Sequence, residues 1–332
     1  MSDRVMKYRV VLPSSPIKDE GGEHTTESLQ DGIGVLKSFG VMPWSDVDVN
    51  GDAVLGDDRR KAETEFGVLS FFAGDDVTRQ RELRTHRGDE SGRGMLLLAC
   101  AKGGYGAARV LEHQEQHEQD EQEDKIRTVL LGFSDVTALL LSRYAHGIRG
   151  DIHGPCLTLL NKEPAWSKDR LRLLLSGEAT ALPPIQGEAW IYNNASETAS
   201  GPLVAANLAV ASALIGTRHF PDLTGCILIL EDVTESPQRI DRCLTHWRLA
   251  GHLHRVAGIG FGEWQDCGDK IILQRVLKER TADLGVIIIG NLPIGHHCGD
   301  GIKANAALPL GWHAQLDASS GRLFVSKPIL PT

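Results

Sequence analysis

The sequence predicts an α/β protein with two domains. Short apolar runs of the kind that form buried parallel strands alternate with segments of helical length and pattern. The run Met95–Ala101 is apolar throughout, as expected of a central strand covered on both faces. A chain of 332 residues is long for one domain and suits two. We therefore expect an N-terminal domain over residues 1–160, a linker over 161–200 and a C-terminal α/β domain over 201–332.

Bulk composition predicts an ordinary soluble protein. Hydrophobic residues make up 41% of the chain and charged residues 24%. The formal net charge of −9 and the lack of Lys/Arg runs argue against a nucleic acid or an anionic membrane as partner. The cysteines are scattered without a C-x-x-C pair, which is typical of a reducing compartment. Since the sequence shows no apolar leader and no apolar run of membrane-spanning length, a cytoplasmic location is expected.

The N-terminal domain is expected to begin with a strand at Tyr8–Leu12, which ends in the rigid loop Pro13–Pro16. A helix follows at Glu27–Gly40, where apolar residues recur on one face and a glycine ends the pattern. The Asp- and Arg-rich stretch after this helix is less regular. Within it we expect a strand at Val68–Phe72 and a helix at Val77–Arg87.

The run Met95–Ala101 leads into the glycine-rich turn Lys102–Gly106, after which a helix starts at Ala107. Three glycines in four positions let the backbone approach a ligand or another chain segment closely. The turn lacks the spacing of a dinucleotide-binding or phosphate-binding loop. No nucleotide cofactor is therefore expected.

The next segment, His113–Lys125, contains acids, glutamines and two histidines but no apolar residue. Two histidines four residues apart among carboxylates are also compatible with a metal site. The composition favours a solvated insertion, because the segment has nothing to bury. We expect an insertion and no metal.

The stretch Thr128–Thr137 places a serine on a tight turn. Thr128–Leu131 has the composition of a strand, Gly132 breaks it, and Val136–Ala145 has that of a buried helix. Ser134 therefore lies where its hydroxyl is exposed above a sheet edge and where the first N–H groups of the helix point at any ligand. This is the placement of a nucleophile elbow, although the spacing differs from G-x-S-x-G. Capping of the helix is the alternative role of this serine.

The linker is predicted from the absence of a sustained pattern, with Pro164, Pro183 and Pro184 as interruptions and one helix at Lys168–Ser176. A short strand that ends in a tight turn is expected before it, at Arg149–Pro155. The C-terminal domain alternates strands and helices. Its expected elements are Leu203–Ile215 as a helix or the approach to one, strand Cys226–Leu230, helix Arg239–Ala250, strand Val256–Phe261, helix Lys270–Arg280, strand Leu284–Ile289 and a hairpin over Leu316–Val325.

Two polar residues follow strands of the C-terminal domain, Glu231 and His296. Ligands and catalytic groups usually lie at the carboxyl ends of strands in open α/β sheets. A serine nucleophile needs a neighbouring base, and a histidine base needs a carboxylate that orients it and stabilises the imidazolium. Ser134, Glu231 and His296 supply these three residue types. Pairing of Glu231 with Arg239 or Arg242, and a packed surface position for His296, are the alternatives.

Several segments resemble, in chain order, signature segments of the LD-carboxypeptidase family of serine peptidases, which includes muramoyltetrapeptide carboxypeptidases and microcin-immunity hydrolases. They are K-G-G-Y-G-A-A-R-V-L (Lys102–Leu111), G-F-S-D-V-T-A-L (Gly132–Leu139), H-G-P (His153–Pro155), N-L-A-V-A-S-A-L-I-G-T (Asn207–Thr217), Phe220–Arg242 with its L-E-D and R-I-D-R, and G-H…A-L-P-L-G (Gly295–Gly311). The resemblance extends from Pro13 almost to the C-terminus.

The resemblance implies a triad of Ser134 as nucleophile, His296 as base and Glu231 as orienting carboxylate. It implies an oxyanion hole formed by the backbone N–H groups of Asp135 and Gly104. The implied fold is a flavodoxin-like N-terminal domain with a parallel sheet and a smaller C-terminal α/β domain that carries Glu231 and His296. The implied substrate is a muropeptide or related small peptide, cleaved at an L,D-peptide bond by a homodimer without cofactor in murein recycling.

The chain departs from the family pattern in four places. Lys102 stands where the glycine loop usually begins with arginine, and Ala205-Ala206 precede Asn207 where two glycines are usual. The acidic insertion replaces a shorter, more apolar connection. The segment after His296 is longer than usual, which makes His297 a competitor for the role of base.

Three other functions stay open. A microcin-immunity type of amidohydrolase acting on peptidyl or aminoacyl nucleotides would need an aromatic platform, which Trp190 or Trp264 can supply. A catalytically silent muropeptide-binding protein would bind the peptide without chemistry. A metal enzyme built on His296, His297 and Cys298 is disfavoured because adjacent residues of one loop do not easily converge on one ion.

Overall fold

The computed structural model describes residues 6–17, 25–44, 76–83, 95–113, 127–190, 197–297 and 304–328. By its internal contacts the chain divides into two units. The first unit comprises Met1–Leu139 and Pro155–Glu163, and the second comprises Leu140–Gly154 and Pro164–Thr332. The predicted strand at Val68–Phe72 lies outside the described residues.

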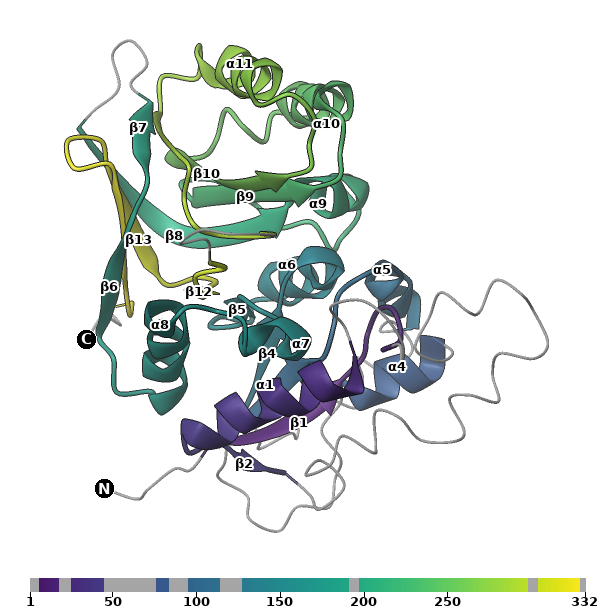
Figure 1. Cartoon of the computed structure of the whole chain (residues 1–332). Coiled ribbons are helices and arrows are strands. Elements are labelled where there is room, and N and C mark those ends of the chain that lie inside the picture. Colours follow the sequence, from purple (N-terminus) through teal and green to yellow (C-terminus); the bar gives the residue numbers. More distant parts are fainter. Residues whose placement is uncertain are drawn as a thin grey trace. The chain divides into compact units, whose positions relative to one another are not determined.

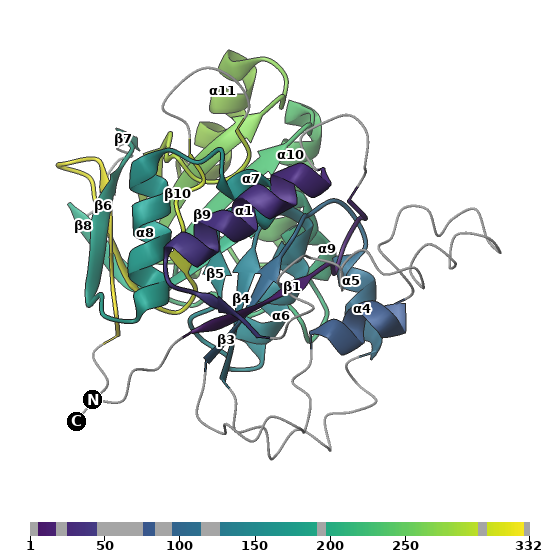
Figure 2. The same ribbon diagram turned by 60° about the horizontal axis from the view of Figure 1, so that its bottom comes forward.

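The first unit contains a parallel sheet (Figure 1 and Figure 2). Its strands are β1 (Lys7–Val11), β2 (Met42–Pro43), β3 (Met95–Cys100) and β4 (Arg127–Gly132). Neighbouring strands follow the order β2-β1-β3-β4, and every pair is parallel. The same order opens a flavodoxin-like sheet. The α/β class with a flavodoxin-like N-terminal sheet is thus confirmed.

The first unit also contains helices and 3₁₀ turns. They are α1 (Thr26–Ser38), α4 (Asp76–Glu82), α5 (Ala107–Val110) with the 3₁₀ turn η3 (Leu111–His113), the 3₁₀ turn η5 (Ser134–Val136) and α7 (Leu157–Leu160); α6 (Thr137–Ala145) continues into the second unit. A capping box between Thr25 and Ser28 starts α1. A Cβ atom on Gly32 would lie 1.9 Å from the Leu157 carbonyl oxygen, so the glycine lets α1 pack directly on α7.

The second unit is built on an eight-stranded sheet with the order β6-β14-β13-β8-β9-β10-β11-β7. The bounds are β6 (Ala181–Gln186), β7 (Glu188–Trp190), β8 (Thr198–Asn207), β9 (Ile227–Val233), β10 (Gly258–Gln265), β11 (Ile287–Gly290), β13 (His313–Asp317) and β14 (Arg322–Ser326). The four central strands β8, β9, β10 and β11 are parallel, and the flanking strands are antiparallel. Two short strands of the second unit, β5 (Ile152–His153) and β12 (Leu308–Pro309), form an antiparallel pair.

Four helices belong to the second unit: α8 (Ala165–Ser176), α9 (Leu208–Leu214), α10 (Pro237–Leu249) and α11 (Lys270–Thr281). Figure 1 shows α10 and α11 side by side above the parallel strands. The Ser236 hydroxyl caps α10 and the Asp269 carboxylate caps α11, each by accepting backbone N–H groups of the first turn. The predicted helices and strands from Cys226 onward are present, with shifts of a few residues at their ends.

Two stretches differ from the sequence-based expectation. Residues 161–200, predicted as a linker with one helix, also contain β6, β7 and the start of β8. Proline suggested a loop there, but β6 is an edge strand, where a missing N–H is tolerated. Of Leu203–Ile215, expected as a helix or the approach to one, Leu208–Leu214 form helix α9. Leu203–Asn207 are instead the end of strand β8, because an apolar segment at a central position of a parallel sheet is stable as a strand.

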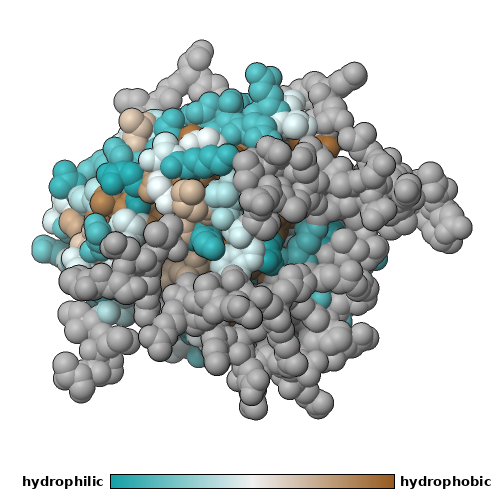
Figure 3. Space-filling model, turned by 90° about the horizontal axis from the view of Figure 1, so that it is seen from below, coloured by the Kyte–Doolittle hydropathy of each residue, from teal (hydrophilic) through white to brown (hydrophobic). Residues whose placement is uncertain are grey.

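The coloured surface in Figure 3 is mostly hydrophilic, and hydrophobic residues appear there in small separate areas. Within the ranges that the structure describes, no helix combines the length and apolar character needed to cross a bilayer.

Candidate active site

Three loops of the first unit follow the carboxyl ends of neighbouring parallel strands. β1 leads into the loop Pro13–Pro16, β3 into the glycine-rich turn Lys102–Gly106, and β4 into Ser134. Parallel strands place such loops at one edge of the sheet, so the three loops meet there.

Ser134 has a left-handed backbone conformation, with φ of 62°. A non-glycine residue rarely adopts this conformation, and it recurs at functional turns. The turn joins β4 to α6, and the Ser134 side chain is half-buried. A Cβ atom on Gly103 would lie 3.0 Å from the Ser134 Cβ atom and 3.3 Å from Oγ. The glycine therefore gives the serine the room that it needs.

Gly104 also has a positive φ, 118°, and a Cβ atom there would lie 2.3 Å from Ser15 Oγ. The Ser15 N–H donates to the Gly103 carbonyl at 3.4 Å, and Ser15 Oγ accepts the Tyr105 N–H at 3.0 Å. Because a trans peptide directs its C=O and N–H oppositely, the Gly104 N–H points away from Ser15. In the described part of the chain, the Gly104 N–H makes no hydrogen bond to a backbone carbonyl in a turn or loop.

Two buried side chains connect these loops. The Asp135 carboxylate accepts the Ala107 N–H at 2.7 Å. Burial raises the pKa of Asp135, against the opposing effect of this hydrogen bond. The Arg79 guanidinium, which is 1% exposed, donates to the carbonyls of Pro13 and Gly106. Sequence reasoning missed Arg79, because the stretch around it carries no regular pattern.

In the second unit, polar side chains also gather at the carboxyl ends of the parallel strands. Asn207 at the end of β8 lies in register with Glu231 on β9, and Asp232 lies in register with Trp264 on β10. The loop after β11 carries His296 at the same edge.

Glu231 and His296 are in direct contact. His296 Nδ1 lies 2.7 Å from Glu231 Oε2, and the His296 backbone N–H donates to the same oxygen at 3.1 Å. Glu231 is 1% exposed, and its other oxygen, Oε1, has no donor among the described residues. One carboxylate oxygen therefore fixes both the backbone and the ring of His296. The neutral ring carries its proton on Nδ1 and its lone pair on Nε2.

Each member of this pair shifts the pKa of the other. Burial acts to raise the pKa of Glu231, but the His296 imidazole and its hydrogen bonds outweigh it, so this pKa is lowered. Burial acts to lower the pKa of His296, but the Glu231 carboxylate outweighs it, so this pKa is raised. Burial also lowers the pKa of the nearby His153 to about 4, which keeps that ring neutral at pH 7.

Two glycines make room for Glu231. Gly295 has φ of 102°, and a Cβ atom there would lie 2.5 Å from Glu231 Oε2. A Cβ atom on Gly262 would lie 2.4 Å from the Ile294 carbonyl oxygen and 3.2 Å from Glu231 Cβ. The contact between the carboxylate and His296 thus depends on the absence of side chains at both positions.

Gly295→Ala is expected to reduce the catalytic activity of this site about 100-fold, because the new methyl group would push His296 away from Glu231. It should also lower the free energy of unfolding by about 2 kcal/mol more than a strain-only control. Gly251→Ala is that control, since Gly251 has φ of 79° and open space around its Cβ position. Denaturant unfolding and kcat/KM of both variants test this. Equal losses in the two variants would refute the steric explanation.

Asp232 is a neighbour that the sequence did not single out. Its carboxylate accepts the Asn207 side-chain amide at 2.9 Å and the Ala209 N–H at the start of α9, also at 2.9 Å. Burial and the negative charge of Glu231 raise the pKa of Asp232 to about 6. Asn207 in turn caps α9 through the Val210 N–H. Ala205 and Ala206 lie in β8, directly before this cap.

Other residues considered from the sequence have separate surroundings. Lys102 Nζ lies 3.5 Å from the Pro16 carbonyl oxygen. Arg239 pairs with Glu235 at 2.7 Å rather than with Glu231. Trp190 is buried against Phe261, with ring centroids 5.7 Å apart. Trp264, the other candidate for the aromatic platform, lies beside Asp232 on the neighbouring strand. Residues 114–125 and Cys298 lie outside the described residues.

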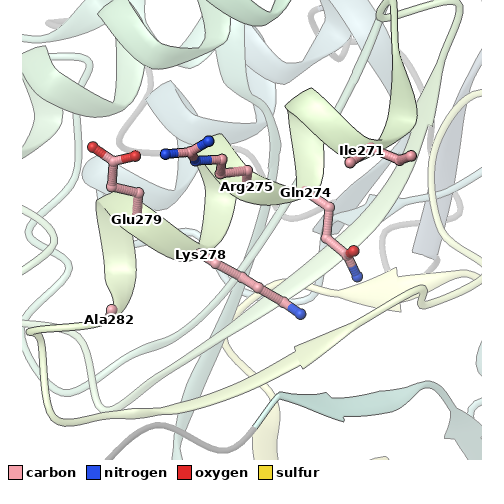
Figure 4. A pocket seen from close by; sticks show the side chains of 6 residues that line it. All are labelled: Ile271, Gln274, Arg275, Lys278, Glu279 and Ala282. Atoms are coloured by element: carbon pink, nitrogen blue, oxygen red, sulfur yellow. The ribbon is translucent and has the colours of Figure 1, made fainter.

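A pocket of about 450 Å³ lies along α11 (Figure 4). Its lining consists of Ile271, Gln274, Arg275, Lys278, Glu279 and Ala282. No residue singled out from the sequence lines it. Within the ranges described, no three histidine, cysteine or acidic side chains are grouped so that they could hold a metal ion.

Comparison with known proteins assigns the chain to a class and to a family. Residues 9–154 match the LD-carboxypeptidase N-terminal domain, and residues 200–316 match the LD-carboxypeptidase C-terminal domain. Both halves thus define a peptidase, a hydrolase of peptide bonds. The chain belongs to the LD-carboxypeptidase family, as its resemblance had implied.

Two curated relatives agree with this assignment. A putative carboxypeptidase of Synechocystis sp. is 40% identical over 324 residues, which cover 96% of this chain and 93% of that protein. A murein tetrapeptide carboxypeptidase of Pseudomonas aeruginosa is 30% identical over 234 residues, 66% of this chain and 72% of that protein.

Two solved structures share the fold. A muramoyltetrapeptide carboxypeptidase from Oxalobacter formigenes has a TM-score of 0.72 at 21% identity and covers 99% of this chain and 100% of its own. An MccF-like protein from Streptococcus pneumoniae, in complex with AMP, has a TM-score of 0.71 at 21% identity. The match covers 97% of this chain and 99% of that protein.

Proposed function

We propose that this protein is a serine LD-carboxypeptidase that cleaves the L,D-peptide bond before the terminal D-amino acid of a cell-wall muropeptide. The contact of His296 with the buried Glu231 carboxylate carries the proposal, because it is the arrangement that a general base requires. The family assignment and the relative named murein tetrapeptide carboxypeptidase support the substrate class.

In the proposed reaction His296 Nε2 takes the hydroxyl proton of Ser134 as Oγ attacks the scissile carbonyl. Glu231 holds the Nδ1 proton and stabilises the imidazolium that forms. The N–H groups of Asp135 and Gly104 would donate to the oxyanion of the tetrahedral intermediate. The imidazolium then protonates the leaving amine, the D-amino acid departs, and a water molecule activated by the same histidine hydrolyses the acyl-enzyme.

The place of this reaction is also part of the proposal. Cytoplasmic murein recycling by a homodimer follows from the family resemblance. Sedimentation analysis of the purified chain checks the dimer, and fractionation of the producing cells checks the compartment.

A panel of muropeptides that differ in length and in the stereochemistry of the last residue tests the substrate. Release of a D-amino acid from an L,D-bonded tetrapeptide is expected, with little from the L,L isomer. An aminoacyl sulfamoyl adenylate belongs in the same panel for two reasons. An MccF-like protein of the same fold binds AMP, and in this chain Trp264 lies beside Asp232. Turnover of the nucleotide alone would establish the amidohydrolase alternative. Tight binding of tetrapeptide without turnover would establish a silent binding protein.

The dependence of kcat/KM on pH is expected to report the Glu231–His296 pair. The base must be neutral, and the raised pKa of His296 means that activity falls on acidification already above pH 6.5, the ordinary pKa of histidine. Glu231→Gln removes the larger of the two negative charges that raise this pKa and leaves that of Asp232, so the acidic limb should move to lower pH. The maximal rate of this variant should fall about 10⁴-fold, because the amide does not stabilise the imidazolium. If the acidic limb of the pH profile does not move in Glu231→Gln, that limb reports the titration of a group other than His296.

A further inference from the structure

The loop of residues 291–296 carries His296, and β10 holds one side of it. The Leu292 N–H donates to the Phe261 carbonyl at 3.0 Å, and the Glu263 N–H donates to the Ile294 carbonyl at 2.8 Å. These bonds hold the first part of the loop beside the sheet. They do not reach Gly295, whose backbone turns the chain toward Glu231.

The other side of the loop is held by residues 304–307, here called the return segment. The Ala306 N–H donates to the Pro293 carbonyl at 2.9 Å, and Asn305 Oδ1 accepts the Gly295 N–H at 2.9 Å. All four residues of the return segment are at most 1% exposed. A buried N–H without an acceptor is costly, so the Asn305 oxygen favours this one conformation of the turn.

Arg170 of α8 holds the return segment from behind. It is 2% exposed, and its Nε donates to the Ala307 carbonyl at 2.8 Å. The same guanidinium donates to the Pro183 carbonyl of β6. Burial lowers the pKa of Arg170 to about 9. A buried guanidinium bonded to two carbonyls on different elements fixes the return segment against the body of the unit.

We infer that Asn305 is a positioning residue for His296, acting through the Gly295 N–H. The turn at Gly295 determines whether both the backbone N–H and Nδ1 of His296 reach one oxygen of Glu231. Arg170 keeps the Asn305 oxygen in place by holding the chain two residues further on. The inference rests on the proposed function in one respect, the role of His296 as base.

The Nδ1 proton of His296 provides a readout that does not depend on activity. In full-length protein with ¹⁵N-labelled histidine, this proton should give a downfield NMR signal, assigned by its loss in His296→Gln. Asn305→Leu has the same number and branching of side-chain heavy atoms and no acceptor, so the signal should disappear or shift. Asn305→Asp keeps an oxygen and should keep the signal. Thr281→Val is the matched control, because it removes a buried hydrogen bond to the Leu277 carbonyl on α11.

Kinetics supplies the second readout. Asn305→Leu should lower kcat for tetrapeptide hydrolysis about 100-fold with little change in KM, since it misplaces the base and leaves substrate binding intact. Asn305→Asp should stay within about tenfold of wild type, because the acceptor oxygen is retained. If Asn305→Leu does not fold, Asn305→Ala takes its place in both measurements.

The two failures are distinguishable. A folded Asn305→Leu or Asn305→Ala with the wild-type signal and wild-type kcat overturns the inference. A wild-type protein that hydrolyses no muropeptide overturns the proposed function, and the NMR comparison then still decides whether Asn305 orients His296.

Discussion

Ser134→Ala is expected to reduce hydrolysis of an L,D-tetrapeptide by roughly 10⁵- to 10⁶-fold, because the nucleophile, base and carboxylate of the proposed triad would act as a unit. Substrate binding should persist, since the hydroxyl contributes little to binding the ground state. The variant should also fail to react with a fluorophosphonate probe. Stopped assays at high enzyme concentration, with equilibrium binding of the same peptide, measure both effects.

Two further serine variants sharpen this result. Ser142→Ala on α6 removes a buried hydroxyl that contacts His219 Nδ1 at 2.8 Å and should retain hydrolysis. Ser134→Gly should be as inactive as Ser134→Ala but more stable than wild type by about 1 kcal/mol, because glycine relieves the strain at φ of 62°. Near-normal kcat in Ser134→Ala would show that this serine only caps the helix.

His296→Ala is expected to abolish hydrolysis to a similar extent, about 10⁶-fold, while His297→Ala retains most of the activity. The reason is geometric, because the ring of His296 is the one that contacts the Glu231 carboxylate at 2.7 Å. The two variants differ by one position in the same loop, so each is the control for the other. Measured kcat/KM values decide the assignment, and an inactive His297→Ala with an active His296→Ala would reverse it.

A third measurement separates loss of the base from loss of the fold. His296→Ala leaves Glu231 buried without the His296 ring, which should destabilise the protein by about 1–3 kcal/mol. His153 is also buried near Glu231, and burial lowers the pKa of its ring. Thermal unfolding of both histidine variants therefore accompanies the kinetics.

Local pattern determined most of the regular structure. Apolar runs predicted β1, β3, β4, β9 and β11, and helical periodicity predicted α1, α10 and α11. The local sequence pattern gave the wrong element where the position of a segment in the sheet outweighed its intrinsic preference. The prolines of β6 are accommodated because the strand lies at the sheet edge, and the Ala-rich end of β8 is a strand because it lies at the centre of the second sheet.

The sequence by itself also determined which residue types follow the strands, among them Ser134, Glu231 and His296, and its motifs determined the family. Only the tertiary structure decided that His296 meets Glu231, residues that are 65 positions apart. It alone identified Arg79, Asp232 and Asn305, whose partners lie on other loops or strands. Local pattern specifies which face of an element is buried, whereas such contacts depend on strand order and register, which are set when the elements pack together.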